Sequence, residues 1–166
     1  TCNAFGIPLL VFVDTPGFMP GTKQEKGGVI RHGAKLVHAF AEASVPKVTI
    51  VLRKAFGGAF IAMNSRDLGA DYVFAWPQAT LGVMGAKQAV GIVKRRDIAA
   101  ADDPEAARDA FADEYRDEHL TSAVAAAEGY VDEIVHPGDT RRRLSEALRT
   151  LEAVAHPAHG VRNIPL

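Results

Sequence analysis

The feature that most constrains the fold is a buried strand pattern that runs directly into two adjacent glycines. The segment is KVTIVLRKAFGGAFIAM, residues 47–63, and small residues begin a helix after the glycines. Gly57 and Gly58 carry no Cβ, so a ligand atom can approach their backbone closely, and the first N–H groups of the helix point outward at its positive end. This geometry suits an oxygen that develops negative charge, although a simple tight turn explains the two glycines equally well.

Composition indicates one sizeable core and excludes several classes of partner. A chain of 166 residues with 48% hydrophobic content buries about 70% of its unfolded surface on folding. The formal net charge of −1 offers no attraction to nucleic acid or to an anionic membrane. Cys2 is the single cysteine, which excludes an internal disulfide and a cysteine-based metal cluster. Because no signal-like or membrane-length apolar run occurs, we expect a cytoplasmic location, or the mitochondrial matrix in a eukaryote.

Predicted strands alternate with predicted helices, which is typical of an α/β fold with a parallel sheet. Strands are expected at 8–13, 47–53, 72–76, 79–83 and 130–135, and helices at 29–43, from the glycines to near Gly69, and at 86–96, 104–119, 122–129 and 141–155. Residues 14–28 are expected to form a loop and 156–166 an irregular tail. The continuous apolar run at 8–13 predicts a strand buried on both faces. Since no strand precedes it, the chain is expected to be part of a larger unit.

The charged helix expected at 104–119 has distinct boundaries and a narrow apolar face. Asp103 is the predicted N-cap and Pro104 the first helical residue. The narrow apolar stripe indicates a solvated helix that lies over the domain or against another chain.

Two functional interpretations that depend on side chains, a GTPase and a histidine-based catalytic or metal site, have little support in the sequence. FVDTPGF, residues 12–18, resembles a turn of GTPases, but no phosphate-binding G-x-x-x-x-G-K-[ST] loop accompanies it, so Asp14 is expected to cap the turn. His156 and His159 have no carboxylate nearby in sequence, which disfavours a zinc site. His32 and His38 are expected to pack on their helix, and no nucleophile elbow is present.

Backbone donors are the remaining candidates for chemistry. Glycine-rich turns follow predicted strands at 16–21, 56–60 and 82–86. Open α/β sheets bind ligands at the carboxyl ends of their strands. The sequence therefore predicts a site that uses main-chain N–H groups and no metal.

Five segments carry a strong resemblance to a known family. They are DTPGFMPGTKQEKGGVIRHGAKL (14–36), VPKVTIVLRKAFGGAFIAM (45–63), LGADYVFAWPQATLGVMGAKQAV (68–90), AAAEGYVDEIVHPGDTR (125–141) and NIPL (163–166). In this order and spacing the chain resembles the carboxyltransferase β-type subunit of biotin-dependent acyl-CoA carboxylases. The resemblance implies a crotonase-like fold, a spiral of ββα units, of which residues 1–166 would be the later part of the C-terminal domain, with the N-terminal domain absent from this chain.

The resemblance also implies roles for individual residues. Gly58 and Ala59 match the pair whose backbone N–H groups bind the ureido oxygen of biotin, and Gly57 permits its close approach. Because the cofactor is thought to take the acyl α-proton itself, no protein base is required. Ile61 matches a position that bears on acyl-chain preference, where propionyl-CoA enzymes often carry Asp; filling of the core by Ile61 is a comparably good explanation. Further matches around the biotin cavity are Gly17, Gly21, Met84 and Gly85.

The implied partners are a biotin carboxylase and biotin carboxyl carrier subunit, together with further copies of the same subunit, since the active site lies at a subunit interface. Carboxybiotin on the partner and an acyl-CoA are the implied cofactor and substrate. A biotin-dependent carboxyacyl-CoA decarboxylase subunit and a non-catalytic paralogue that serves as an assembly partner are the alternatives.

Overall fold

In the described residues, five strands form a parallel sheet. The computed structural model describes residues 1–19, 21–152 and 154. The strands are β1 (Leu9–Thr15), β2 (Lys47–Phe56), β3 (Tyr72–Ala75), β4 (Thr80–Gly82) and β5 (Glu133–Ile134). They pair in the order β1-β2-β3-β5, and β4 pairs with the second half of β2. The predicted α/β class with a parallel sheet is confirmed.

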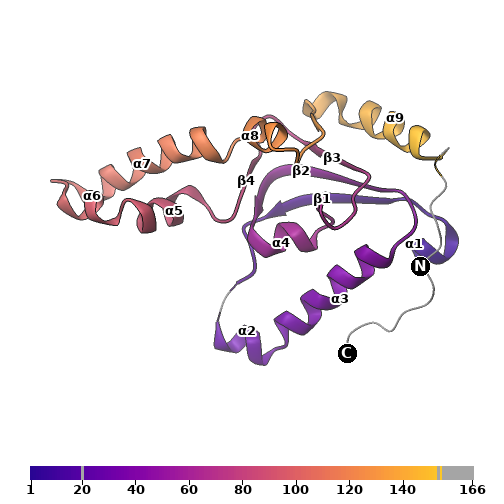
Figure 1. Cartoon of the computed structure of the whole chain (residues 1–166), viewed down its shortest axis with the longest axis horizontal. Helices are drawn as coiled ribbons and strands as arrows, with labels where there is room; N and C mark the ends of the chain where they lie inside the picture. The colour runs from indigo at the N-terminus through magenta and orange to yellow at the C-terminus, as the bar shows by residue number, and fades with distance from the viewer. Residues whose placement is uncertain (20, 153, 155–166) are drawn as a thin grey trace.

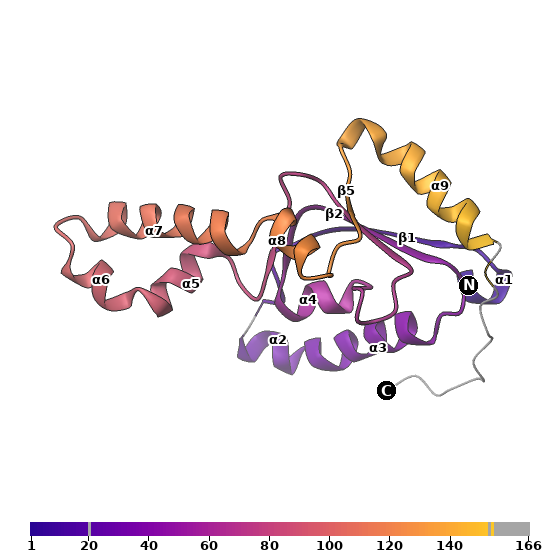
Figure 2. The ribbon, with the colours of Figure 1, turned by 45° about the horizontal axis from the view of Figure 1, so that its top comes forward.

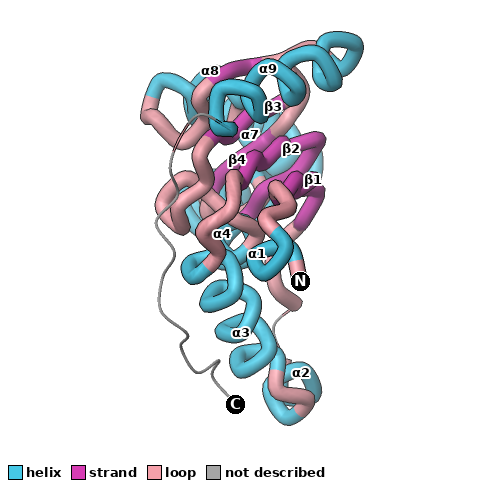
Figure 3. Tube along the Cα trace, turned by 90° about the vertical axis from the view of Figure 1, so that its right-hand side faces the viewer, coloured by secondary structure: helices cyan, strands magenta, loops and turns pink. Residues whose placement is uncertain are grey.

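Helices cover both faces of the sheet and form an arm beside it. They are α1 (Cys2–Phe5), α2 (Thr22–Lys26), α3 (Val29–Glu42), α4 (Gly57–Ala62), α5 (Ala86–Val93), α6 (Arg95–Ala100), α7 (Pro104–His119), α8 (Ser122–Ala127), α9 (Thr140–Glu152) and the 3₁₀ turn η1 (Pro137–Asp139). α3 and α4 lie on one side of the sheet and α9 on the other (Figure 3). α5, α6 and α7 project away from the sheet (Figures 1 and 2).

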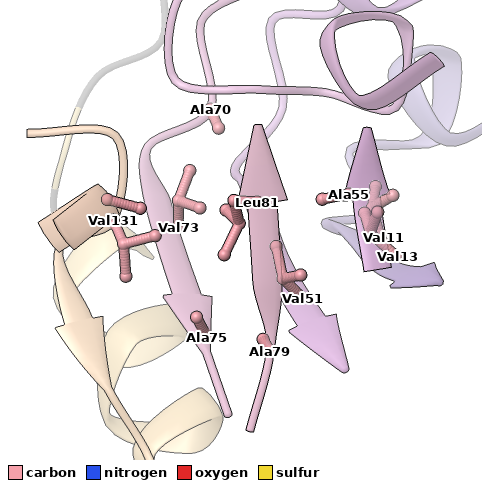
Figure 4. Close-up of a cluster of buried hydrophobic side chains, with 11 residues drawn as sticks. Val11, Val13, Val51, Ala55, Ala70, Val73, Ala75, Ala79, Leu81 and Val131 are labelled. Carbon is pink, nitrogen blue, oxygen red and sulfur yellow. The ribbon is translucent and has the colours of Figure 1, made fainter. Parts of the chain in front are cut away.

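Two apolar clusters hold these layers together. Between the sheet and α4, valines from three neighbouring strands converge (Figure 4), and Phe60 of α4 packs against them. On the opposite face, Leu144, Ala147 and Leu151 of α9 cover Val48 and Ile50 of β2. β2 is therefore buried on both faces over its first half, as its near-continuous apolar sequence requires.

The expectation that the first strand is buried on both faces is wrong. In β1, Val11 and Val13 are buried, whereas Leu10 is 42% and Phe12 52% exposed. Leu10 and Phe12 are in register with Val48 and Ile50 and so share the face that α9 covers. α9 packs over β2 and leaves this face of β1 open in the described part of the chain.

Several predicted boundaries differ because of local pairing and backbone conformation. β2 extends beyond 47–53 since β4 pairs with its last residues, and it enters α4 without an intervening turn. α4 ends at Ala62, well before Gly69, because Asn64 adopts a left-handed φ of 60° that ends helices. β5 occupies two residues of the predicted 130–135.

Short helices account for the other differences. α1 was not predicted, and α2 lies within the expected loop at 14–28; both are too short to show helical periodicity. The helix predicted at 86–96 is interrupted at Lys94, which separates α5 from α6. α9 begins one residue before the predicted 141–155, and the predicted tail at 156–166 lies outside the described residues.

The helix predicted at 104–119 begins as expected, and of its two expected locations the one over the domain is not observed. The Asp103 carboxylate accepts hydrogen bonds from the N–H groups of Glu105 and Ala106, at 3.1 and 3.0 Å, which confirms the N-cap. α7 packs against α5 and α6 to form the arm, and it does not lie over the sheet (Figures 1 and 2). Arg108 of α7 donates to the carbonyl of Lys87 on α5 at 3.0 Å.

Candidate functional site

The N-terminus of α4 presents two backbone donors at the end of the most buried strand. Phe56 is still extended, with φ −117° and ψ 136°, and the helix begins at the next residue. The first N–H groups of a helix have no acceptor within it. Among the described residues, none of the backbone hydrogen bonds outside regular elements uses the N–H of Gly58 or Ala59. Gly58 is exposed and Ala59 is buried, so the donors lie where the core meets the surface.

Gly57 needs to be glycine for two independent reasons. Its φ is +60°, a left-handed conformation that other residues rarely adopt. A Cβ at this position would also lie 3.1 Å from the carbonyl oxygen of Val83. The glycine therefore lets the chain turn from β2 into α4 while the segment after β4 passes close by.

A cavity of about 680 Å³ lies beside these donors. Its walls come from α4, from the segment after β4, from the base of the arm and from α8. The residues of its lining that matter here are Gly57, Gly58, Ile61, Met84, Tyr115 and His119. Most of the exposed lining is apolar carbon, as is typical of small-molecule sites.

The structure brings together some of the predicted site residues. Gly57, Gly58, Ile61 and Met84 line the cavity, and Ile61 is 49% exposed, so it does not fill the core. Gly85 follows Met84 and is the N-cap of α5.

Gly17 and Gly21 do not line the cavity. A Cβ on Gly17 would lie 3.6 Å from the carbonyl oxygen of Phe56, so Gly17 contacts the residue before α4. Gly21 is the N-cap of α2, and the Gln24 side chain occupies the space beside it.

An ion pair joins the end of β1, just before the loop that contains these glycines, to β2. Arg53 donates to both carboxylate oxygens of Asp14, the shortest N–O distance being 2.9 Å. These hydrogen bonds hold the pKa of the Asp14 carboxyl below its ordinary value and raise the pKa of Arg53. The pair lies where the β1–β2 register shifts between Val13 and Thr15, and such irregularities are frequent next to functional sites. Asp14 thus pairs with Arg53 in addition to any role in the turn.

The arm forms part of the cavity wall, which was not expected from the sequence. Ile92 and Val93 of α5 line the cavity and are 66% and 64% exposed. Tyr115 and His119 of α7 contact each other, with ring centroids 4.6 Å apart, and also line it. The spacing of Tyr115 and His119, four residues apart, was the available signal, since it places both on one face of a helix.

Of the histidines considered from the sequence, the two described ones, His32 and His38, do not line the cavity. His32 is exposed on α3, and Nδ1 of His38 lies 3.4 Å from the carboxylate of Glu42 on the same helix. His156 and His159 lie outside the described residues. Within the described residues, no group of three or more His, Cys, Asp or Glu side chains could hold a metal ion, and no helix is long and apolar enough to cross a membrane.

Comparison with known proteins matches the chain to one region of longer proteins. The model of the carboxyl transferase domain family matches residues 1–162. The chain is 54% identical over 147 residues to the methylmalonyl-CoA carboxyltransferase 12S subunit of Propionibacterium freudenreichii subsp. shermanii, which covers 89% of this chain and 28% of the relative. It is 53% identical over 169 residues to the biotin-dependent acetyl-/propionyl-coenzyme A carboxylase beta6 subunit of Mycobacterium tuberculosis. This alignment covers 99% of this chain and 35% of the relative. The chain thus spans about a third of the length of these relatives.

A solved structure gives the same result for the fold. The transcarboxylase 12S structure, described as a hexamer assembly with methylmalonyl-coenzyme A bound, superposes with a TM-score of 0.88 at 50% identity. The match covers 99% of this chain and 32% of that one. The expected crotonase-like fold is confirmed.

Proposed function

The chain belongs to the carboxyl transferase domain family, and we propose that it forms part of the carboxyltransferase component of a biotin-dependent acyl-CoA carboxylase. Such a component moves a carboxyl group from carboxybiotin to the α-carbon of a short or branched acyl-CoA. The observation that carries the proposal is the pair of N–H groups of Gly58 and Ala59: neither has a backbone acceptor outside the regular elements in the described part of the chain, and Gly58 lines the cavity. Relatives named as acyl-CoA carboxylase and carboxyltransferase subunits support the choice of reaction.

The residues fit a ligand that bears a polar oxygen on a ring system. Gly58 has no side chain and is exposed, so a ring can come close to its amide, and the neighbouring apolar cavity accommodates the remainder. A bound carboxybiotin would supply the carboxyl group. The chain itself would donate two hydrogen bonds to the ligand oxygen, from donors already fixed in place by β2, and this preorganisation is what stabilises developing negative charge. Loss of one such donor in other enzymes costs about 3 to 4 kcal/mol of barrier.

The acyl-CoA would be held by another part of the complete protein. We assign residues 1–166 to the later part of its C-terminal domain, which would supply the biotin side of an active site at a subunit interface. The hexamer assembly described for transcarboxylase 12S supports such an oligomer. A biotin carboxylase and a biotin carrier subunit would be the further partners.

Ile61 would influence which acyl group is accepted. Its half-exposed apolar side chain lines the cavity, whereas a carboxylate there would make the same wall charged. An apolar wall separates substrates that differ by one methylene by about 1 to 3 kcal/mol. A preference among short acyl chains is therefore expected, and not an absolute rule.

The proposal is tested with the complete protein in the reverse direction. Incubation with methylmalonyl-CoA and free biotin should transfer the carboxyl group to biotin. The products, propionyl-CoA and carboxybiotin, should form at a rate that depends on the biotin concentration. Gly58→Val should abolish this rate, because the Cβ already reaches contact distance of Phe18 and the two methyl groups must displace that ring or occupy the space beside the amide. Gly58→Ala is the matched control and should retain activity.

Two outcomes would refute the proposal. One is the absence of biotin-dependent turnover in the parent protein with the carboxylated forms of acetyl-, propionyl- and methylcrotonyl-CoA. The other is full activity in Gly58→Val. A biotin-dependent decarboxylase subunit would catalyse the same transfer to biotin, so ATP-dependent fixation of bicarbonate with the partner biotin subunits present separates a carboxylase from a decarboxylase.

A further inference from the structure

The side chain of Phe18 lies in a notch between two helices that is lined by glycine. A Cβ on Gly33 of α3 would lie 3.5 Å from Cζ of Phe18, and a Cβ on Gly58 of α4 would lie 3.8 Å from Cδ2 and Cε2. Because neither residue carries a side chain, the ring comes close to the backbone of both helices. One ring thus joins the loop after β1 to α3 and to the donor end of α4.

The backbone before Phe18 is fixed in the same region. The N–H of Gly17 donates to Oγ1 of Thr15 at 3.3 Å, and Gly17 has a φ of +117°. Gly17 also faces the carbonyl of Phe56, the residue on which α4 begins. Two consecutive loop residues therefore lie near the residues on the two sides of Gly57, and the Asp14–Arg53 ion pair holds the end of β1, where the loop begins, to β2.

The burial of Phe18 is incomplete, although the ring lies between α3 and α4, where a Cβ on either Gly33 or Gly58 would meet it at an ordinary contact distance. It is 49% exposed, so it forgoes a substantial part of the free energy that a fully buried phenylalanine gains, which is about 1.5 to 3 kcal/mol. A ring at this position can hold the donor and exclude water from one side of it.

We propose that Phe18 is a positioning residue that holds the N-terminus of α4, with the amides of Gly58 and Ala59, at a fixed place against α3. This inference rests on the proposed function for its catalytic consequence. It gives the DTPGF segment a role unrelated to nucleotide binding: Asp14 ties the loop to β2, Gly17 makes the reversal, and Phe18 packs against Gly58. Displacement of the donors would weaken their hydrogen bonds in the transition state more than in the ground state, so kcat should respond more than KM.

The test uses the complete protein and four variants. Phe18→Ala should lower kcat for biotin-dependent carboxyl transfer by about tenfold or more, less than the 10² to 10³ lost when a donor is removed, and leave the KM for acyl-CoA unchanged within about twofold. Phe18→Tyr keeps the ring and should restore the parental kcat, with Phe18→Leu between the two. Phe5→Ala removes a phenylalanine that is 76% exposed and is the control.

Hydrogen–deuterium exchange provides a readout that does not depend on activity. Amides of residues 61–63, which can donate to the carbonyls four residues earlier, as Met63 does to Ala59, should exchange faster in Phe18→Ala than in the parent, and Phe5→Ala should leave their exchange unchanged. If Phe18→Ala does not fold, as judged by its melting curve, Phe18→Leu replaces it in the same comparison. Parental kcat together with parental exchange in the truncated variant would overturn the inference, as would failure of Phe18→Tyr to restore kcat. A parent protein without biotin-dependent turnover would refute the proposed function, while the exchange measurement would still decide whether Phe18 holds α4.

Discussion

The two adjacent glycines at the start of α4 should respond in opposite ways to replacement by alanine. Gly57 has a φ of +60°, and a left-handed conformation costs a residue with a side chain about 1 to 2 kcal/mol. Its Cβ would in addition lie 3.1 Å from the carbonyl oxygen of Val83, so that the segment after β4 must move by a few tenths of an ångström. Gly57→Ala should therefore destabilise the fold by about 2 kcal/mol.

Gly58 meets neither restriction. Its φ is not left-handed, and an added Cβ would be 3.8 Å from the Phe18 ring, an ordinary contact distance. Alanine is favoured over glycine in a helix by up to about 1 kcal/mol, because glycine loses more backbone freedom on folding. Gly58→Ala should be neutral or stabilising by up to about 1 kcal/mol.

The assay compares the two variants directly. Urea unfolding of the complete protein, followed by circular dichroism, gives the free energy of unfolding of each variant relative to the parent. The expected gap between them is about 2 to 3 kcal/mol. A gap below about 0.5 kcal/mol would show that the left-handed backbone of Gly57 carries no strain for alanine and would refute this reasoning.

Two further predictions concern charged side chains. The folded-state pKa of Asp14 lies below its ordinary value of 3.8 because of the hydrogen bonds from Arg53, so the ion pair stabilises the fold above about pH 4 and this stabilisation is lost as the pH falls through the lower folded-state pKa. The stability difference between the parent and Asp14→Asn, from urea midpoints between pH 7 and pH 2, should shrink to zero at the acid end; a constant difference would contradict this. Asp103→Ala removes the N-cap of α7 and should cost about 1 kcal/mol, detected as faster amide exchange in its first turn, whereas Asp102→Ala, one residue earlier, should have little effect.

The sequence was sufficient for the class of fold and for the donor end of α4, because both depend on local patterns. The apolar pattern of residues 47–53 predicts a buried strand, and the small residues at and after the two glycines predict the start of a helix. Asp103 and Pro104 predict the start of α7 for the same reason, since capping requires contacts within three residues only.

Features that depend on distant contacts could not be predicted. Whether the apolar face of β1 is covered depends on where α9 packs. The sequence around Leu10 does not indicate whether α9 covers this residue. The helix at 104–119 was expected to lie over the domain or against another chain, because its narrow apolar stripe does not indicate which element it packs against, and in the structure α7 packs against α5 and α6. The contact of Phe18 with Gly33 and Gly58 joins residues 15 and 40 positions apart, so no spacing rule reveals it.

The position of the donors follows mainly from the strand that carries them. β2 contributes Val48 and Ile50 to one cluster and Val51 to the other, and all three are at most 2% exposed. α4 follows this strand directly, so the amides at its start are held as rigidly as the core. Little conformational entropy is therefore lost when a ligand binds to them. Only the exposed side of Gly58 lacks such support, and there the ring of Phe18 supplies it. Substitutions in the first half of β2 should consequently impair both the site and the stability of the fold. Substitution of the half-exposed Phe18 should impair the site with a smaller effect on the fold.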